Sequence, residues 1–300
     1  MRLMSIEIPP IWDQVAGRCL TENLRRILVL GAADRGKSTL CRFLVSRFSQ
    51  EGAQAVLVDA DVGQKDVGPP ATVTRGYLQS PSDPYSLMLD GLYFIGAVTP
   101  VRHLLPMVVG TRDVVDSAGD AFVVVNTTGF IEGVGYALKS YKIEALRPDL
   151  LIAVDPNHET ASIAASYPQY RWVRLPPSAR VVAKSRAMRR EARQRAFAAY
   201  FAGRPKIELD LQTVAFQRNP AFVRSLTSSR QTSPPPAGRH LLCGLCDATG
   251  RCLGLGTLDA LDRRARVLSF VTPVSGPEVR IVQSGDLYIS PDGEELGRTR

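Results

Sequence analysis

A glycine-rich run close to the N-terminus constrains the fold more than any other stretch of this sequence. Residues 31–40 read Gly-Ala-Ala-Asp-Arg-Gly-Lys-Ser-Thr-Leu, follow the apolar segment 27–30 and precede an amphipathic segment. Lys37 and Ser38 complete the spacing G-x-x-x-x-G-K-[ST], in which a turn joins a buried strand to a helix and backbone N–H groups surround a phosphate. The pattern therefore predicts a P-loop that binds a nucleoside triphosphate.

The predicted nucleotide-binding residues belong to this loop and to the first turn of its helix: Gly31, Ala32, Ala33, Asp34, Arg35, Gly36, Lys37, Ser38 and Thr39. In loops of this kind the lysine reaches the β and γ phosphates, and the serine hydroxyl ligates Mg²⁺. We therefore expect Lys37 to be catalytic and Ser38 to be a metal ligand. A chance match to four fixed positions is the alternative, and the strand and helix patterns on either side disfavour it.

Two aspartates follow the next predicted strand. The apolar residues 55–58 lead directly into Asp59 and Asp61. Side chains two apart on a strand share a face, and ligands bind beyond the carboxyl ends of strands in open parallel sheets. One carboxylate can organise the shell of a Mg²⁺ ion, and the other can take a proton from an attacking hydroxyl. Two turn-forming aspartates without a catalytic role are the alternative.

Further apolar segments predict the fold class. They cover residues 92–96, 121–125 and 150–154 and are separated by helical patterns. This alternation predicts a doubly wound α/β fold with a mainly parallel sheet. The intervening residues 65–76 contain Gly68-Pro69-Pro70 and are predicted to be a loop. Residues 103–117 are predicted to be a helix whose inner face consists of Leu104, Leu105, Val108 and Val109.

The pattern changes near residue 205. Short alternating segments separated by turns predict a small β domain over residues 206–300, after a P-loop domain over residues 1–205. A Ser/Pro-rich stretch at about 225–238 is predicted to be a mobile loop in the second domain. A basic helix at about 184–200, which no core obviously needs, is predicted to be a lid on the first domain.

The net charge of +8 has one source in the sequence. Between Arg171 and Arg195 there are nine basic residues and one acid, Glu191, so this segment equals the excess of the whole chain. A basic block on a helix is usually a solvated face. Because this one follows a nucleotide site, it also suits a polyanionic partner such as a nucleic acid.

Cysteine usage and apolar run lengths predict a cytoplasmic protein. Five cysteines do not form a disulfide framework, and no apolar run approaches the ~18 residues that a membrane span needs. A zinc site is conceivable where Cys243 and Cys246 lie near His240 and Cys252. Residues 241–258, however, have the pattern of a β-hairpin, which favours ordinary strand positions for these cysteines.

Several of these motifs together resemble one family, the polynucleotide 5′-hydroxyl kinases, which includes the kinase subunit of the eukaryotic mRNA 3′-end cleavage factor. The likeness extends from about residue 5 to the end and is carried by six segments: the P-loop, Asp-Ala-Asp-Val-Gly-Gln at 59–64, Gly-Pro-Pro-Ala-Thr at 68–72, Asn-Thr-Thr-Gly-Phe at 126–130, the arginine-rich helix ending at Phe201, and Gly-Leu-Gly at 254–256.

The resemblance implies a role for each motif. It implies that Asp61 is the general base on an RNA 5′-hydroxyl, that Asp59 supports the metal, and that Lys184 and Arg189 of the lid neutralise the migrating phosphoryl group. It further implies that Gln64 helps to position metal or phosphate and that the segment Thr128-Gly129-Phe130 clasps the end of the acceptor. We also expect Gln64, and Arg193 of the basic helix, to contact the acceptor. Two positions depart from the family pattern, since Phe130 replaces a usual Trp and Lys184 replaces an arginine, whose planar fork a lysine cannot reproduce.

Three functions fit these features. The leading hypothesis is a Mg²⁺-dependent kinase that uses ATP or GTP to phosphorylate the 5′-hydroxyl of RNA, with DNA as a further acceptor. A P-loop NTPase switch or assembly factor would hydrolyse nucleotide without an acceptor. A nucleotide-bound scaffold would bind without turnover, although the intact Lys37, Ser38 and Asp61 argue against it.

Overall fold

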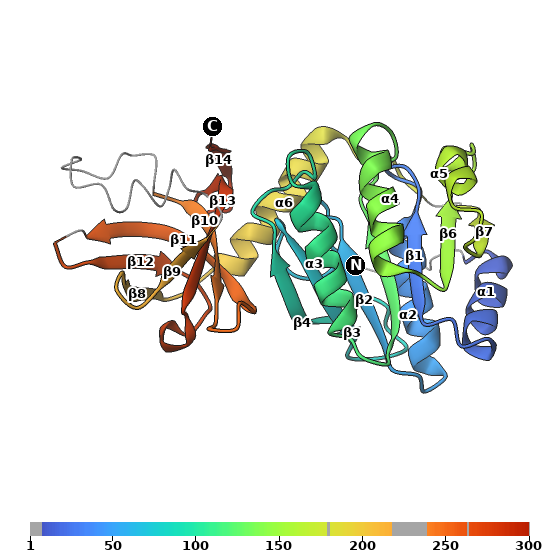
Figure 1. Cartoon of the computed structure of the whole chain (residues 1–300), viewed down its shortest axis with the longest axis horizontal. Coiled ribbons are helices and arrows are strands. Elements are labelled where there is room, and N and C mark those ends of the chain that lie inside the picture. Colours follow the sequence, from blue (N-terminus) through green and yellow to red (C-terminus); the bar gives the residue numbers. More distant parts are fainter. Residues whose placement is uncertain (1–7, 179–180, 218–238, 263, 300) are drawn as a thin grey trace. The chain divides into compact units, whose positions relative to one another are not determined.

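The computed structural model describes residues 8–178, 181–217, 239–262 and 264–299. The chain divides into two compact units, each described by itself (Figure 1). The first comprises Met1–Gly68, Val73–Gly91 and Thr99–Arg186, and the second comprises Pro69–Thr72, Leu92–Val98 and Ala187–Arg300.

A mixed seven-stranded sheet forms the centre of the first unit, in the order β4-β3-β2-β5-β1-β6-β7. Strands β2, β5, β1, β6 and β7 run parallel, and β3 runs antiparallel to β2. The mainly parallel α/β fold is therefore confirmed. The strands are β1 (Arg26–Leu30), β2 (Ala55–Ala60), β3 (Thr72–Leu78), β4 (Leu87–Phe94), β5 (Phe122–Thr127), β6 (Leu150–Val154) and β7 (Trp172–Leu175).

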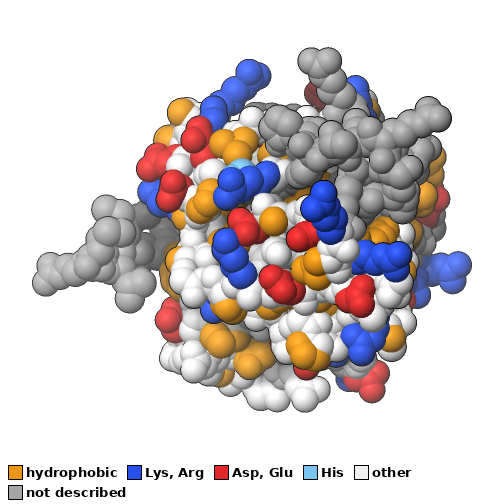
Figure 2. Space-filling model, turned by 90° about the vertical axis from the view of Figure 1, so that its left-hand side faces the viewer, with side chains coloured by type: hydrophobic (Ala, Val, Ile, Leu, Met, Phe, Trp, Pro, Cys, Tyr) orange, Lys and Arg blue, Asp and Glu red, His pale blue; other side chains and the backbone are white. Residues whose placement is uncertain are grey.

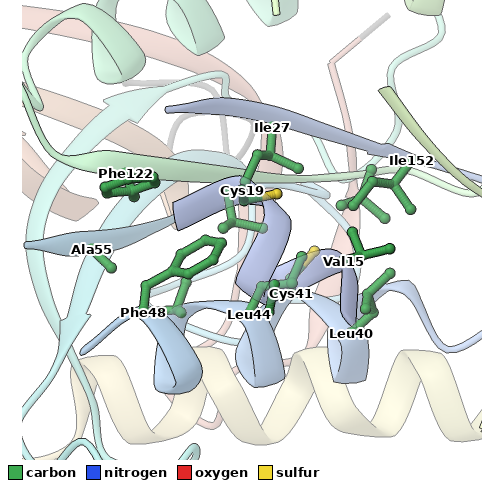
Figure 3. Packing of buried hydrophobic residues seen from close by; sticks show 14 of the residues in the cluster. Val15, Cys19, Ile27, Leu40, Cys41, Leu44, Phe48, Ala55, Phe122 and Ile152 are labelled. Atoms are coloured by element: carbon green, nitrogen blue, oxygen red, sulfur yellow. The ribbon is translucent and has the colours of Figure 1, made fainter. Parts of the chain in front are cut away.

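Five helices accompany this sheet: α1 (Pro10–Thr21), α2 (Lys37–Gln50), α3 (Leu104–Asp116), α4 (Val134–Leu146) and α5 (Ala161–Ser166). Helix α2 packs with α1, and α3 packs beside α4 (Figure 1). The inward positions of α2 repeat at helical spacing, at Leu40, Cys41, Leu44, Val45 and Phe48. Figure 3 shows four of them, Leu40, Cys41, Leu44 and Phe48, against Ile27, Phe122 and Ile152 of the sheet. One apolar core therefore fixes the P-loop between β1 and α2.

One local prediction was wrong and another was incomplete. Residues 65–76 are not all loop, because strand β3 begins at Thr72, where Thr72, Val73 and Thr74 are buried. The strand predicted at 92–96 is the end of the longer β4, which begins at Leu87. The glycines and prolines that suggested a loop occupy the turn before β3.

The predicted inner face of α3 was also wrong. Leu105 is 74% exposed and Val109 is 46% exposed, whereas the buried residues are Met107, Gly110, Thr111, Val114 and Val115. Small residues at 110 and 111 allow this other face to approach its neighbours. The Thr111 hydroxyl donates to the Met107 carbonyl at 2.6 Å, which satisfies it inside the core.

An antiparallel sheet dominates the second unit, in the order β14-β13-β10-β11-β12-β8, with β9 parallel to β13. Its elements are α6 (Arg186–Phe201), β8 (Lys206–Asp210), β9 (Ala215–Gln217), β10 (Leu241–Cys246), β11 (Cys252–Asp262), β12 (Val267–Val271), η1 (Gly276–Glu278), β13 (Ile281–Ile289) and β14 (Glu295–Arg298). Nearly all of α6 groups with this unit, so the division falls at residue 186 and differs from the predicted 205. Phe197 and Phe201 of α6 are buried in its core. The Ser/Pro-rich stretch at about 225–238 lies outside the described residues.

The cysteines of this unit are buried residues of a hairpin. Cys243 and Cys246 lie on β10, Cys252 lies on β11, and the two strands pair antiparallel, as the pattern at 241–258 predicted. Among the described residues, no three His, Cys, Asp or Glu side chains are grouped so that they could hold a metal ion. Within the same described ranges, no helix has the length and apolar character to cross a bilayer.

Candidate functional site

The P-loop has the backbone geometry that its sequence requires. Gly36 precedes α2 at a left-handed φ of 81°, and a Cβ on Gly31 would lie 2.3 Å from the carbonyl oxygen of Val154. Lys37 is only 7% exposed, and its Nζ donates to the Ala32 carbonyl at 2.7 Å. The loop therefore directs Lys37 back across itself, at the N-terminus of α2.

The segment before α6 lies against this loop. The backbone N–H of Lys184 donates to Asp34 Oδ2 at 3.1 Å, and a Cβ on Gly36 would lie 2.9 Å from Val181 Cγ2. The Lys184 side chain itself is exposed. Arg35 pairs with Glu159, with 2.7 Å between Nε and Oε1. The predicted lid residue Lys184 is thus placed beside the predicted nucleotide-binding residues.

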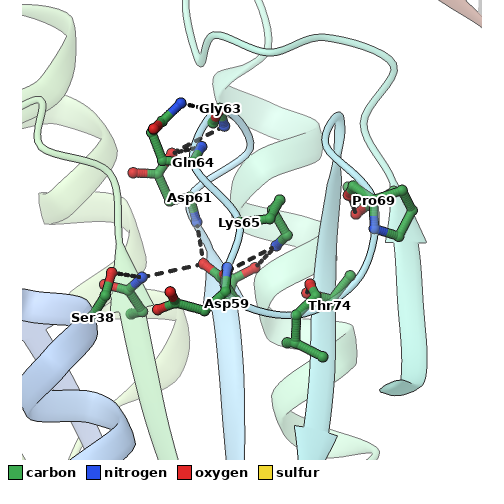
Figure 4. Close-up of polar contacts among 12 residues, drawn as sticks. Ser38, Asp59, Asp61, Gly63, Gln64, Lys65, Pro69 and Thr74 are labelled. Atoms are coloured by element: carbon green, nitrogen blue, oxygen red, sulfur yellow. Dashed lines mark hydrogen bonds and ion pairs between the residues drawn. The ribbon is translucent and has the colours of Figure 1, made fainter. Parts of the chain in front are cut away.

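Asp59 is fully buried and saturated with donors (Figure 4). Its Oδ1 accepts from the Asp61 N–H at 3.1 Å, and its Oδ2 accepts from the Asp66 N–H at 2.7 Å. The buried Lys65 Nζ lies 3.5 Å from Oδ2. Burial raises the pKa of Asp59 to about 6, and the Lys65 charge partly offsets this rise.

Asp61 is oriented by its own turn. Its Oδ1 accepts from the N–H groups of Gly63 at 3.0 Å and Gln64 at 3.1 Å, and the carboxylate is partly exposed (Figure 4). Gln64 in turn donates from Nε2 to the Gly63 carbonyl at 2.6 Å. An aspartate that binds the backbone two residues on is held in a defined direction. Asp61 is therefore a fixed carboxylate at the edge of the site, whereas Asp59 is enclosed within it.

Asn126 connects the P-loop to these carboxylates, a role that sequence reasoning did not assign. It is the last residue but one of the buried strand β5, with Val29 of β1 on one side and Asp59 of β2 on the other. Its Nδ2 lies 3.2 Å from Ser38 Oγ and 3.3 Å from Asp59 Oδ1. Its Oδ1 is buried without a hydrogen-bond partner among the described residues. One feature of the sequence could have identified Asn126: its polar amide directly follows four apolar strand residues.

The predicted acceptor residues at 128–130 form a loop beside the P-loop, which we call the acceptor loop. A Cβ on Gly129 would lie 2.5 Å from both the N and the Cα of Ala33, so only glycine allows this approach. Thr128 is buried, whereas Phe130 is 46% exposed. The structure therefore brings nucleotide-binding and acceptor-binding candidates into contact, with one aromatic ring accessible.

Arg189 and Arg193 lie on α6, in the second unit. Arg193 pairs with Glu295, with 2.5 Å between Nε and Oε1. Other members of the basic block are also paired, Arg171 with Glu22 at 2.5 Å and Arg174 with Asp155 at 2.6 Å. Acids from elsewhere in the chain thus neutralise part of this block.

The charge on one face of the second unit is mixed. Figure 2 shows basic side chains interspersed with acidic ones rather than gathered in one patch. Ion pairs occur within this unit as well, since Asp259 lies 2.8 Å from Lys206 and 3.6 Å from Arg239. This face does not have the single-sign charge that a nucleic-acid backbone favours.

Two lysines on the inner face of α4 were missed by sequence reasoning. Lys139 and Lys142 are fully buried and share the helical face of Leu138, Ile143 and Leu146. The Nζ of Lys142 has no hydrogen-bond partner among the described residues. Burial lowers the pKa of Lys142 to about 7, against the smaller opposing effects of Asp61 and Asp59.

We expect Lys142→Met to stabilise the protein at neutral pH. The pKa of an unfolded lysine is about 10.4, and the pKa of Lys142 is lower in the folded protein. Burial of this lysine therefore destabilises the folded state fully at pH values below the folded pKa, and the destabilisation disappears as the pH rises toward the unfolded pKa. The variant should therefore melt at a higher temperature than wild type at pH 7, and the difference should shrink by pH 10. Thermal denaturation of both proteins across this range tests it, and a difference independent of pH would contradict it.

Three comparisons place this chain among known proteins. The family described as mRNA cleavage and polyadenylation factor CLP1 P-loop matches residues 31–203. The polyribonucleotide 5′-hydroxyl-kinase of Pyrococcus furiosus is 28% identical and covers 98% of this chain and 96% of its own length. That of Methanocaldococcus jannaschii is also 28% identical, over 93% of this chain and 91% of its own length.

A eukaryotic relative and a solved structure are similar to this chain as well. The polyribonucleotide 5′-hydroxyl-kinase Clp1 of Rattus norvegicus is 31% identical over 59% of this chain and 45% of its own length. The structure of the wild-type Clp1p–Pcf11p complex superposes with a TM-score of 0.68 at 15% identity, over 92% of this chain and 77% of that one, which shows the shared fold. The resemblance seen in the sequence is thus confirmed. Because the family match runs from the P-loop through α6, over more than half of the residues, the chain belongs to the mRNA cleavage and polyadenylation factor CLP1 P-loop family.

Proposed function

We propose that the protein is a polyribonucleotide 5′-hydroxyl kinase that transfers the γ-phosphoryl group of ATP or GTP to the 5′-hydroxyl of RNA, with DNA as a further acceptor. The observation that carries the proposal is the chain of contacts from Ser38 through Asn126 to Asp59, with the oriented Asp61 next to it. Relatives matched over nearly their whole length bear the name of this activity.

The residues present fit a Mg²⁺ ion. Magnesium takes oxygen ligands and keeps several waters. Asn126 Oδ1 is buried without a partner among the described residues, and Nδ2 of the same side-chain amide lies 3.2 Å from the Ser38 hydroxyl oxygen. Ser38 and Asn126 would hold the ion, and Asp59, whose oxygens already accept from protein donors, would support it by its charge. When bound, such an ion neutralises charge on the β and γ phosphates.

The chain's own side chains would carry the transfer. Lys37 binds the phosphates. Asp61 accepts the proton of the 5′-hydroxyl while the hydroxyl oxygen forms a bond to the γ-phosphorus. The bond between the γ-phosphorus and the bridging oxygen breaks, and the nucleoside diphosphate leaves with that oxygen. Arg189 and Lys184 neutralise charge on the transferred group. Gln64, Thr128, Gly129, Phe130 and Arg193 position the acceptor end, and Arg193 would have to exchange its Glu295 partner for a phosphate.

Labelling of an acceptor tests the proposal. Purified protein is incubated with γ-labelled ATP, Mg²⁺ and a matched pair of RNA and DNA oligonucleotides with 5′-hydroxyl ends. The control is the same RNA already phosphorylated at its 5′ end. Label on the 5′-hydroxyl RNA, with none on the RNA that is already phosphorylated at its 5′ end, supports the kinase, and the DNA oligonucleotide shows whether DNA is an acceptor too. Phosphate release without labelled acceptor would instead indicate a P-loop NTPase switch, and neither product would indicate a scaffold.

Phe130→Ala should raise the KM for the acceptor by about 5- to 150-fold, because stacking of a base on an aromatic ring contributes roughly 1 to 3 kcal/mol. The ring is accessible, at 46% exposure, so its loss should change nucleotide binding little. Acceptor KM and melting temperature are measured on the same variant. A lower melting temperature with an unchanged KM would show that Phe130 only packs under its loop.

A further inference from the structure

The side-chain amine of one buried lysine, Lys139, is hydrogen-bonded to the acceptor loop. The Nζ of Lys139 donates to the Thr128 carbonyl at 2.6 Å and lies 3.0 Å from Thr128 Oγ1. Both side chains are buried, with Lys139 fully enclosed. Two contacts from one atom to a single residue fix the position and rotation of that residue more firmly than either contact alone.

The surroundings of Lys139 explain why it is buried at all. No salt bridge to Lys139 occurs among the described residues, and its hydrogen bonds go to Thr128. Burial lowers the pKa of Lys139 well below its usual range, and the charges of Lys142 and Lys37 lower it further. A lysine in an apolar face costs free energy unless its amine is bonded, so the two contacts to the loop account for its place there.

The loop is held from two further directions. Gly129 approaches the Ala33 backbone so closely that a Cβ there would lie 2.5 Å from it. Gly135, in the first turn of α4, approaches Phe130 just as closely, since a Cβ there would lie 2.5 Å from the Phe130 carbonyl carbon. Lys139 lies one helical turn further along α4. Helix α4 therefore contacts both ends of the acceptor loop: Gly135 lies against Phe130, and Lys139 is hydrogen-bonded to Thr128.

We propose that Lys139 is a positioning residue for the acceptor: through Thr128 it holds the acceptor loop in the conformation that binds the 5′ end of the polynucleotide. The inference rests on the proposed kinase function. Lys139 is enclosed and does not itself touch the acceptor, so its effect is transmitted through Thr128 and the loop backbone.

Lys139→Met tests the role, since methionine keeps most of the length and removes the donor. We expect the KM for a 5′-hydroxyl RNA to rise about tenfold, as loss of one or two such hydrogen bonds implies. The KM for ATP should change less than about threefold, and kcat should stay within about threefold of wild type. Hydrogen–deuterium exchange of peptides covering residues 127–131 should become faster in the unliganded variant, which reports on the loop without any activity.

Lys142→Met is the matched control, because Lys142 is equally buried one turn away on the same helix face and makes no bond to the loop. It should leave acceptor KM and loop exchange at wild-type values. Wild-type loop exchange in Lys139→Met, or equal changes in both variants, would overturn the proposal. If Lys139→Met does not fold, Lys139→Gln, which is too short to reach Thr128, gives the same comparison. Failure of the wild type to label RNA would refute the kinase function instead, and the exchange measurement would still judge the loop.

Discussion

Asp61→Asn should reduce phosphoryl transfer to a 5′-hydroxyl RNA by about 10²- to 10⁴-fold, which is the usual contribution of a positioned general base. The amide keeps the size of the side chain and can still accept from the N–H groups of Gly63 and Gln64, so the turn should survive. What it loses is the ability to take the proton of the acceptor hydroxyl.

The measurement is single-turnover transfer together with the affinity for ATP. Nucleotide affinity should remain near wild type in Asp61→Asn, because the hydrogen bonds that orient the Asp61 carboxylate come from Gly63 and Gln64 of its own turn and not from the P-loop. Lys37→Ala is the contrasting variant, since it should lose phosphate affinity as well as transfer. Transfer by Asp61→Asn at close to the wild-type rate would remove Asp61 from the role of base.

Arg189→Ala should lower kcat by about 10³-fold or more, as for other arginines that neutralise charge developing on a transferred phosphoryl group. A group that acts in the transition state changes kcat, whereas a group that attracts the acceptor backbone changes KM. Arg189 is partly buried on α6, while Arg195 further along the helix is exposed and pairs with Glu191 at 3.1 Å.

Arg195→Ala therefore serves as the control for Arg189→Ala. It should leave kcat within about twofold and raise only the acceptor KM, with an effect that fades as salt is added, because exposed charges are screened. Both variants are assayed at two salt concentrations. If both change only KM, and to the same extent, the helix is a solvated basic face and Arg189 is not catalytic.

The parts of this fold that the sequence predicted are those in which local pattern and tertiary contact agree. The spacing of Gly31, Gly36, Lys37 and Ser38 leaves few conformations open to a loop between a buried strand and a helix, and the structure has that loop. Strand β3 was missed because Gly68, Pro69 and Pro70 signal a turn, and a turn signal does not say where the next strand begins.

Other features depend on contacts that periodicity does not contain. The apolar residues Leu105 and Val109 fit a helical stripe as well as Met107 and Val114 do, and only packing against the neighbouring elements selects between the two faces. The sequence does not show which core Phe197 and Phe201 pack into, and α6 was therefore assigned to the first domain. Lysine is almost always solvated, and the inward-facing Lys139 and Lys142 could not be recognised without the structure.

The contact between Gly129 and Ala33 has a consequence for how the two substrates bind. The acceptor loop and the nucleotide loop are in direct contact here, so neither can move toward the other. The free energy that binding of one substrate uses to order this contact does not have to be supplied again when the other substrate binds. Binding of donor and acceptor should therefore be thermodynamically linked, and linkage is reciprocal: the factor by which nucleotide changes the affinity for a polynucleotide end equals the factor by which that end changes the affinity for nucleotide.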